Sequence, residues 1–80
     1  MKSYPDKQIL TLYVHTKSPL SCSALKNLVK ISQTNNFKKK YDLKIVEIDK
    51  HPEVIEKNNI LATPLLILKS KNSEKRILGN

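Results

Sequence analysis

The chain has 80 residues, enough for a single domain over residues 1–80 and too few for a second. Its formal net charge is +8, carried by 14 lysines and one arginine, and hydrophobic residues make up 39% of the sequence. Gly79 is the only glycine, which argues against the glycine-rich loops that bind phosphates and dinucleotides. No apolar run approaches the roughly 18–20 residues that span a bilayer, so no membrane contact is expected. The N-terminal MKSYPDKQ lacks the apolar core of a signal peptide, and we expect the protein to stay where it is made.

The first half of the chain predicts a strand, a helix and a second strand. Ile9–Val14 is almost wholly apolar and rich in β-prone residues, as in a strand buried on both faces. Ser18 is placed to cap a helix over residues 19–33, whose first residue is a proline and whose apolar residues recur at helical spacing. The polar residues 33–40 are expected to close that helix with a basic turn. Leu43–Ile48 forms the second strand, and a crossover of this length predicts a right-handed βαβ unit with parallel strands.

The second half predicts a short helix and two further strands. Residues 49–59 repeat the helix-start chemistry, with Val54 and Ile55 expected to face inward. Leu65–Leu68 reads as a third strand, and Arg76–Leu78 as a short fourth strand after a turn. The resulting order, βαβαββ, is that of an α/β thioredoxin-like domain whose final helix is missing.

Thr63-Pro64, directly before the third strand, is the most informative local feature. In thioredoxin-like domains a proline at this position is commonly cis. An X-Pro bond also biases its preceding residue toward extended geometry and can simply begin a strand, and most X-Pro bonds are trans. The cis and trans states both remain open at this stage.

The cysteine content argues against a redox enzyme. Thiol–disulfide exchange needs an attacking and a resolving cysteine, usually as CxxC at the start of the first helix. The corresponding residues here are Ser18-Pro19-Leu20-Ser21, and the lone Cys22 follows them. We expect Cys22 to pack as a small hydrophobic residue.

The two histidines, His15 and His51, are expected to be loop residues and not metal ligands. No catalytic, metal or cofactor site is expected, and the protein is not expected to be an enzyme.

The order of motifs resembles the KaiB family of circadian clock proteins. The matching segments run through nearly the whole chain: ILTLYV, SPLSCSALKNL, YDLKIVEIDKHPEV, ILATPLLIL and KRILGN. The most specific of them is Ile60-Leu61-Ala62-Thr63-Pro64, which is followed at family-like spacing by KRILG. Single pieces such as LYV would be weak evidence, but five in order at the right spacing are a specific signature.

The resemblance implies a non-catalytic, partner-binding protein of a circadian clock. KaiB proteins bind the N-terminal ATPase ring of hexameric KaiC and modulate its phosphorylation cycle. They then sequester KaiA and compete with a sensor histidine kinase. They are metamorphic, exchanging a tetrameric fold with a thioredoxin-like monomer that binds KaiC, which requires two packings of similar free energy. The implied location is the cyanobacterial cytoplasm or the plastid stroma.

By position, the resemblance makes Tyr41, Lys44, Lys75 and Arg76 the candidate partner-binding residues, with Thr63-Pro64 as a structural element. The chain departs from the family pattern at Ser23, where a basic residue is usual. It also stops at Asn80, so we expect a truncated family member without the last helix and acidic tail. The sheet face left uncovered by that truncation predicts association into a dimer or tetramer.

Three other interpretations remain open. The first is the thioredoxin-like sensory domain of a KaiC-interacting histidine kinase, and the second is a diverged cyanobacterial or plastid relative without clock function. The third is a nucleic-acid binder, suggested by the basic charge. The scattered lysines and the presence of only four aromatic residues, without a stacking motif, do not favour it.

Overall fold

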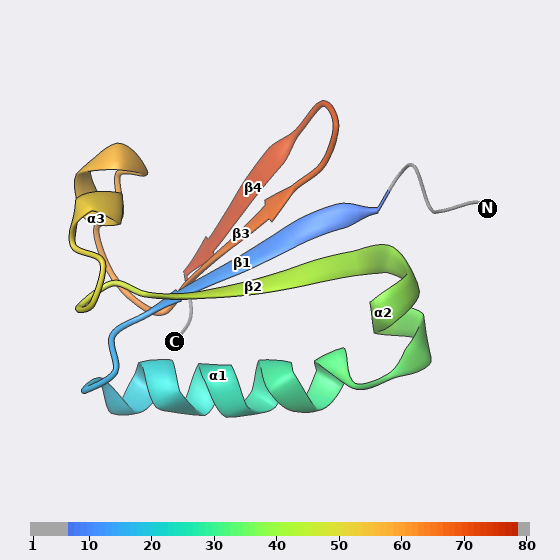
Figure 1. Cartoon of the computed structure of the whole chain (residues 1–80), viewed down its shortest axis with the longest axis horizontal. Helices are drawn as coiled ribbons and strands as arrows, with labels where there is room; N and C mark the ends of the chain where they lie inside the picture. Colours follow the sequence, from blue (N-terminus) through green and yellow to red (C-terminus); the bar gives the residue numbers. More distant parts are fainter. Residues whose placement is uncertain (1–6, 79–80) are drawn as a thin grey trace.

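The computed structural model describes residues 7–78 and is built on a four-stranded sheet of order β2-β1-β3-β4 (Figure 1). The strands are β1 (Gln8–Val14), β2 (Tyr41–Glu47), β3 (Leu65–Lys69) and β4 (Glu74–Leu78). β1 is parallel to β2 and antiparallel to β3, and β4 is antiparallel to β3. The predicted parallel βαβ unit and the two C-terminal strands are therefore confirmed.

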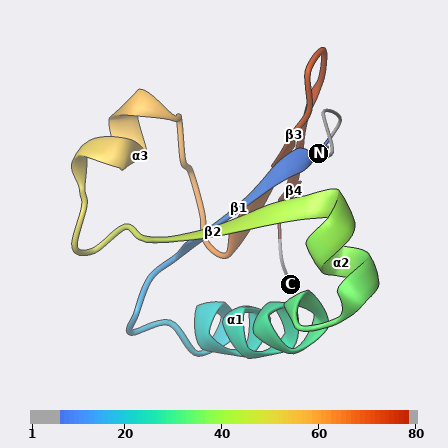
Figure 2. The same cartoon turned by 45° about the vertical axis from the view of Figure 1, so that its right-hand side comes forward.

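β1 lies inside the sheet because both of its faces are apolar. Leu10, Leu12, Tyr13 and Val14 are all buried, and side chains of a strand alternate between the two faces. Ile9, near the start of the strand, is 36% exposed. We call the face that carries Leu10 and Leu12 the α1 face, and the face that carries Thr11 and Tyr13 the α3 face, after the helices that lie on them (Figure 2).

Helix α1 (Pro19–Ser32) begins where the sequence predicts. The Ser18 side chain accepts a hydrogen bond from the backbone N–H of Ser21 at 3.2 Å, and proline occupies the first turn. The helix packs loosely on the sheet: Val29 and Ile31, at 37% and 54% exposure, remain largely in solvent.

The basic segment expected to end this helix is instead a separate helix, α2 (Asn35–Lys40). The Thr34 hydroxyl caps it by accepting a hydrogen bond from the Phe37 N–H at 3.3 Å. Phe37 is buried, and its ring centroid lies 4.9 Å from that of Tyr41. The prediction of a simple turn was wrong because one capping hydroxyl and one buried ring order six otherwise polar residues.

Helix α3 (Glu53–Lys57) covers one end of the α3 face. The buried cluster there consists of Tyr13, Ile48, Ile60, Leu65 and Ile67. Val54 and Ile55 pack against this cluster, so their predicted inward orientation is confirmed. The chain then reaches β3 through a cis peptide bond between Thr63 and Pro64, which resolves the state left open by the sequence.

Candidate partner-binding site

The sheet register brings together two of the four predicted partner-binding residues. Thr11 of β1 is the register partner of Lys44 in β2 and of Ile67 in β3, and Ile67 is the partner of Arg76 in β4. Register partners in neighbouring strands point to the same face. Lys44 and Arg76 therefore stand at the two ends of one row across the α3 face, although they lie on opposite edge strands.

A hollow of about 290 Å³, which we call the basic groove, lies between these two residues. It is lined by Ile9, Thr11, Tyr13, Lys44, Lys57, Asn58, Ile67, Lys69, Glu74 and Arg76. Its floor is formed by apolar and hydroxyl-bearing side chains of β1 and β3, and its rim is charged. The rim carries four basic side chains and one carboxylate, so the groove attracts anionic groups.

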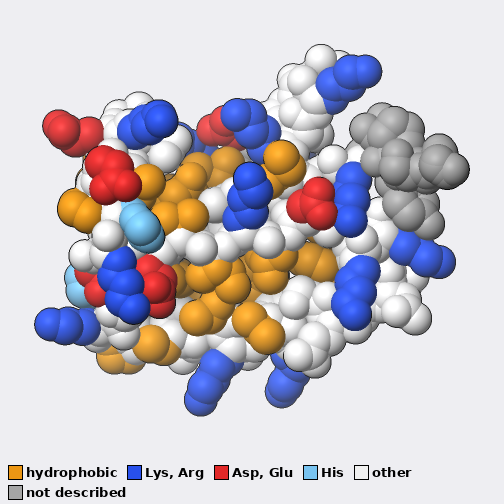
Figure 3. Space-filling view, in the orientation of Figure 1, with side chains coloured by type: hydrophobic (Ala, Val, Ile, Leu, Met, Phe, Trp, Pro, Cys, Tyr) orange, Lys and Arg blue, Asp and Glu red, His pale blue; other side chains and the backbone are white. Residues whose placement is uncertain are grey.

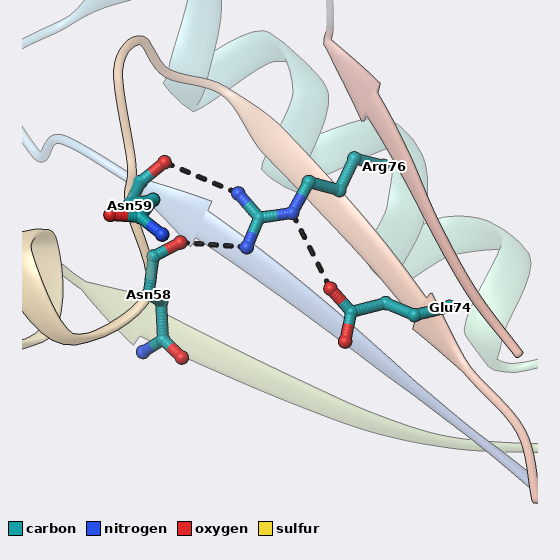
Figure 4. Close-up of polar contacts among 4 residues, drawn as sticks. All are labelled: Asn58, Asn59, Glu74 and Arg76. Atoms are coloured by element: carbon teal, nitrogen blue, oxygen red, sulfur yellow. Dashed lines mark hydrogen bonds and ion pairs between the residues drawn. The ribbon is translucent and has the colours of Figure 1, made fainter.

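Arg76 fixes one wall of the groove (Figure 4). Its guanidinium donates hydrogen bonds to the backbone carbonyls of Asn58, at 2.7 Å, and Asn59, at 3.2 Å. Its Nε also lies 3.4 Å from Glu74 Oε2. Asn59 adopts a positive φ of 53° in the turn after α3, a conformation that asparagine tolerates better than most residues. Arg76 therefore ties the end of α3 to the edge strand β4, as well as supplying charge.

The surface around the groove is predominantly basic. In the space-filling view, Lys and Arg side chains border the hydrophobic areas, and acidic side chains gather mainly toward the α3 end (Figure 3). Lys44, Lys57 and Lys69 are all exposed. Exposed charges of this kind act mainly by steering association and by selecting partners, and salt screens them.

The other two predicted partner-binding residues lie on the opposite face. Tyr41 is the register partner of Gln8, and Lys75 is the partner of Leu68, which places both on the α1 face. Tyr41 is half-buried against Phe37, whereas Lys75 is exposed. The four residues therefore form two groups, of which only Lys44 and Arg76 share a groove.

The predicted structural element, Thr63-Pro64, also contributes to the α1 face. Pro64 is buried and Thr63 is half-buried. Pro64 borders an apolar hollow of about 200 Å³ between α1 and the sheet. The lining residues are Leu12, Ala24, Asn27, Leu28, Ile31, Pro64, Leu66 and Ile77.

A second polar cluster lies at the carboxyl ends of the parallel strands. The Asp49 carboxylate accepts hydrogen bonds from both the backbone N–H, at 3.2 Å, and the hydroxyl of Thr16. The Thr16 hydroxyl bond is the main cause that lowers the pKa of Asp49 from its ordinary value. This contact joins the loop after β1 to the loop after β2.

The cysteine and the histidines lie at the same end of the molecule. Cys22 is exposed, and its Sγ lies 3.6 Å from the Thr16 carbonyl oxygen, so the expectation that it packs as a small hydrophobic residue was wrong. Its place in the first turns of α1 leaves it at the surface, because Ser21 occupies the buried position there. His15 and His51 lie in loops, as predicted. In the part of the chain that the structure describes, no three metal-ligating side chains come together.

Comparison with solved structures defines the class of fold. The Drosophila melanogaster thioredoxin Deadhead superposes with a TM-score of 0.78 at 16% identity, covering 92% of this chain and 70% of its own. Chloroplastic thioredoxin z gives a TM-score of 0.81 at 13% identity, covering 92% and 66%. The chain therefore has a thioredoxin-like α/β fold, as predicted. Within residues 7–78, no helix is long and apolar enough to cross a membrane.

Comparison of sequences defines the family. Residues 11–80 match the KaiB domain. The circadian clock oscillator protein KaiB of Prochlorococcus marinus strain MIT 9211 is 43% identical over 72 residues, covering 90% of this chain and 62% of the relative. KaiB of Rippkaea orientalis is 35% identical over 80 residues, covering 100% and 76%. The chain belongs to the KaiB family, and it spans about three fifths of the length of the first relatives it matches.

Sequence reasoning missed two basic residues of the groove, Lys57 and Lys69. Lys57 ends α3 and Lys69 ends β3, so only the tertiary fold brings them beside Lys44. The alternation of Lys69 with the apolar residues of β3 is the one sequence signal that could have assigned it to the α3 face.

Proposed function

We propose that this protein is a non-catalytic clock component that binds a KaiC-like ATPase ring through the basic groove. The observation that carries the proposal is the convergence of Lys44, Lys57, Lys69 and Arg76 around one hollow in a KaiB-family domain. Of the four residues that the family resemblance makes partner-binding candidates, Lys44 and Arg76 are the two that line this groove. KaiA and a sensor histidine kinase are proposed as further partners of the ring-bound chain.

The chemistry of the groove favours an acidic protein surface. An apolar floor flanked by flexible lysines accommodates an aliphatic or aromatic side chain between carboxylates, because lysine stems cover apolar surface while their ammonium groups stay in water. Charge complementarity of this kind mainly increases the association rate and excludes other basic surfaces. Tyr41 and Lys75, on the opposite face, are proposed to contribute only at the margin of the contact or to a second partner.

Size-exclusion chromatography of the purified chain with a KaiC hexamer tests the proposal. Incubation for several hours should yield a complex that co-elutes with the ring. Lys44→Glu should weaken binding by about tenfold or more, because it removes a favourable charge and adds a repulsive one. Lys30→Glu is the matched control: Lys30 is an exposed lysine on α1, away from the groove, and its reversal changes the net charge equally.

The two variants distinguish binding at the basic groove from attraction by the net charge of the chain. A Lys30→Glu protein that retains most of its binding, beside a Lys44→Glu protein that does not, supports the groove. Equal losses in both variants would indicate that net charge alone drives association. A folded wild-type chain that never co-elutes with the ring would contradict the proposed partner.

A further inference from the structure

A second hollow, of about 580 Å³, lies at the end of the sheet where β1 begins and the β3–β4 hairpin turns (Figures 1 and 2). We call it the hairpin hollow. Its lining residues are Lys7, Gln8, Ile9, Lys69, Ser70, Lys71 and Asn72. Its volume falls within the range of roughly 300–1,000 Å³ that is typical of small-molecule sites. Ile9 and Lys69 also line the basic groove, so the two hollows adjoin without coinciding.

The charged side chains that line the hairpin hollow are all basic. Three of its seven lining residues are lysines, and none is Asp or Glu. Within residues 7–78, Lys69 and Lys71 form no ion pair, and both are exposed. Lys7 lies 3.1 Å from Asp42, whose side chain is 58% exposed. Because ammonium groups around one hollow repel one another, an anion that lies between them is attracted by all three.

The pairing of β1 with β3 brings these lysines together from distant parts of the chain. Ile9 is the register partner of Lys69, so the two side chains lie on the same face of the sheet, the α3 face. Lys7 comes directly before β1, and Lys71 comes two residues after β3 ends. Both therefore lie beside the Ile9–Lys69 pair, at the rim of the hollow.

Hydrogen bonds hold the turn that carries Lys71. The Ser70 backbone N–H donates to the Ser73 carbonyl oxygen at 2.9 Å, and the hydroxyl oxygens of the two serines lie 2.7 Å apart. These contacts close the turn around Lys71 and Asn72. Since the backbone of the turn is already ordered, a ligand that binds there loses less conformational entropy than it would on a flexible loop.

The lining residues indicate the class of anion. Lysine binds phosphate as a point charge, and the amides of Gln8 and Asn72 and the hydroxyl of Ser70 supply further hydrogen-bond donors. A hollow of this volume holds more than one phosphate group, and its lysines come from both sides. We infer that the hairpin hollow binds an oligophosphate, the group that inorganic tripolyphosphate and nucleoside triphosphates share. Side chains bind the phosphates here, so the glycine-rich loop that the chain lacks is not required.

Isothermal titration calorimetry of the 80-residue chain with sodium tripolyphosphate in physiological salt tests the inference. The wild type should bind one molecule per chain. Lys71→Gln should raise the dissociation constant by about tenfold, because it removes one charge-assisted contact. Lys30→Gln is the matched control: Lys30 is an exposed lysine on α1, away from the hollow, and its loss changes the net charge equally. Its dissociation constant should stay within about twofold of the wild type, because salt screens distant charges.

Amide chemical shifts locate the ligand and separate its two sources. Tripolyphosphate should shift the resonances of residues 8–9 and 69–72, with little change at Lys57 and Asn58, which line only the basic groove. ATP without magnesium provides the second titration. An affinity for ATP no greater than that for tripolyphosphate identifies the phosphates alone as the recognised group. Tighter binding of ATP that Ile9→Ala weakens identifies a nucleotide whose base contacts Ile9, a side chain that is 36% exposed.

Three results would overturn the inference. The first is the absence of saturable tripolyphosphate binding by the folded wild type. The second is an equal loss of affinity in Lys71→Gln and Lys30→Gln, which would attribute binding to the net charge of the chain. The third is a set of shifts centred on Lys57 and Asn58, which would place the anion in the basic groove. Circular dichroism of each variant confirms that it is folded.

Discussion

At the scale of single residues, the contact between Thr16 and Asp49 makes stability depend on pH. Because the folded state lowers the Asp49 pKa, the contact stabilises the protein fully above the unfolded-state pKa of about 3.9. Its contribution is lost as the pH falls through the lower folded-state pKa. Asp49→Asn should therefore destabilise the chain at pH 7 and make little difference in strong acid, as measured by urea unfolding at both pH values. Thr16→Val removes the hydroxyl of the same hydrogen bond, so its effect on the free energy of unfolding should not add fully to that of Asp49→Asn. Fully additive effects in the double variant would contradict a direct Thr16–Asp49 interaction.

Arg76 has a structural role that its charge alone does not provide. Its guanidinium bridges two backbone carbonyls, whereas a lysine at this position reaches at most one of them with comparable geometry. Arg76→Lys should lower the free energy of unfolding by about 1 kcal/mol and speed amide exchange in the turn after α3. Native-state hydrogen exchange measures both effects. Unchanged protection in residues 58–60 would show that the guanidinium bonds do not hold this turn.

At the scale of elements, α2 depends on its cap and on one aromatic side chain. Thr34→Ala removes the hydroxyl that accepts the Phe37 N–H and should lower the free energy of unfolding by about 1 kcal/mol. Asn35→Ala is the control: this exposed residue begins the helix, and its change should fall within about 0.5 kcal/mol of zero. Guanidinium denaturation followed by circular dichroism compares the two. Equal effects would indicate that the Thr34 hydroxyl does not cap the helix.

Helix α2 is the element that could not be predicted from the sequence. The strands and α1 could be predicted because apolar periodicity and the Ser18-Pro19 start are local signals. α2 could not, since its six residues contain one apolar side chain, and their order comes from burial of Phe37 against the rest of the fold. Sequence alone also could not show that Lys44 and Arg76 lie on one face of the sheet and Tyr41 and Lys75 on the other. That division depends on how the strands pair, and the sequence of a single strand does not determine its pairing register.

At the scale of the whole molecule, the thioredoxin-like framework positions a surface rather than a pair of cysteines. The residues that start α1 anchor the helix through Ser18 and Ser21, and the only thiol, on Cys22, faces solvent. On the α3 face, four basic side chains, one each from β2, α3, β3 and β4, instead border one basic groove. If this groove binds an acidic ring, the association rate should fall steeply as salt rises, and stopped-flow mixing at increasing ionic strength measures it. A rate that is independent of salt would contradict electrostatic steering.

Hydrogen exchange of the chain alone and bound to a KaiC hexamer is the decisive measurement for the basic groove, because it locates the contact on the fold. Binding at the groove should give new protection in the turn after α3 and in β4, the two segments that Arg76 joins, with little change in α1. Protection concentrated in α1, with β4 and the α3 turn exchanging as in the free chain, would place the partner on the opposite face and contradict binding at the groove.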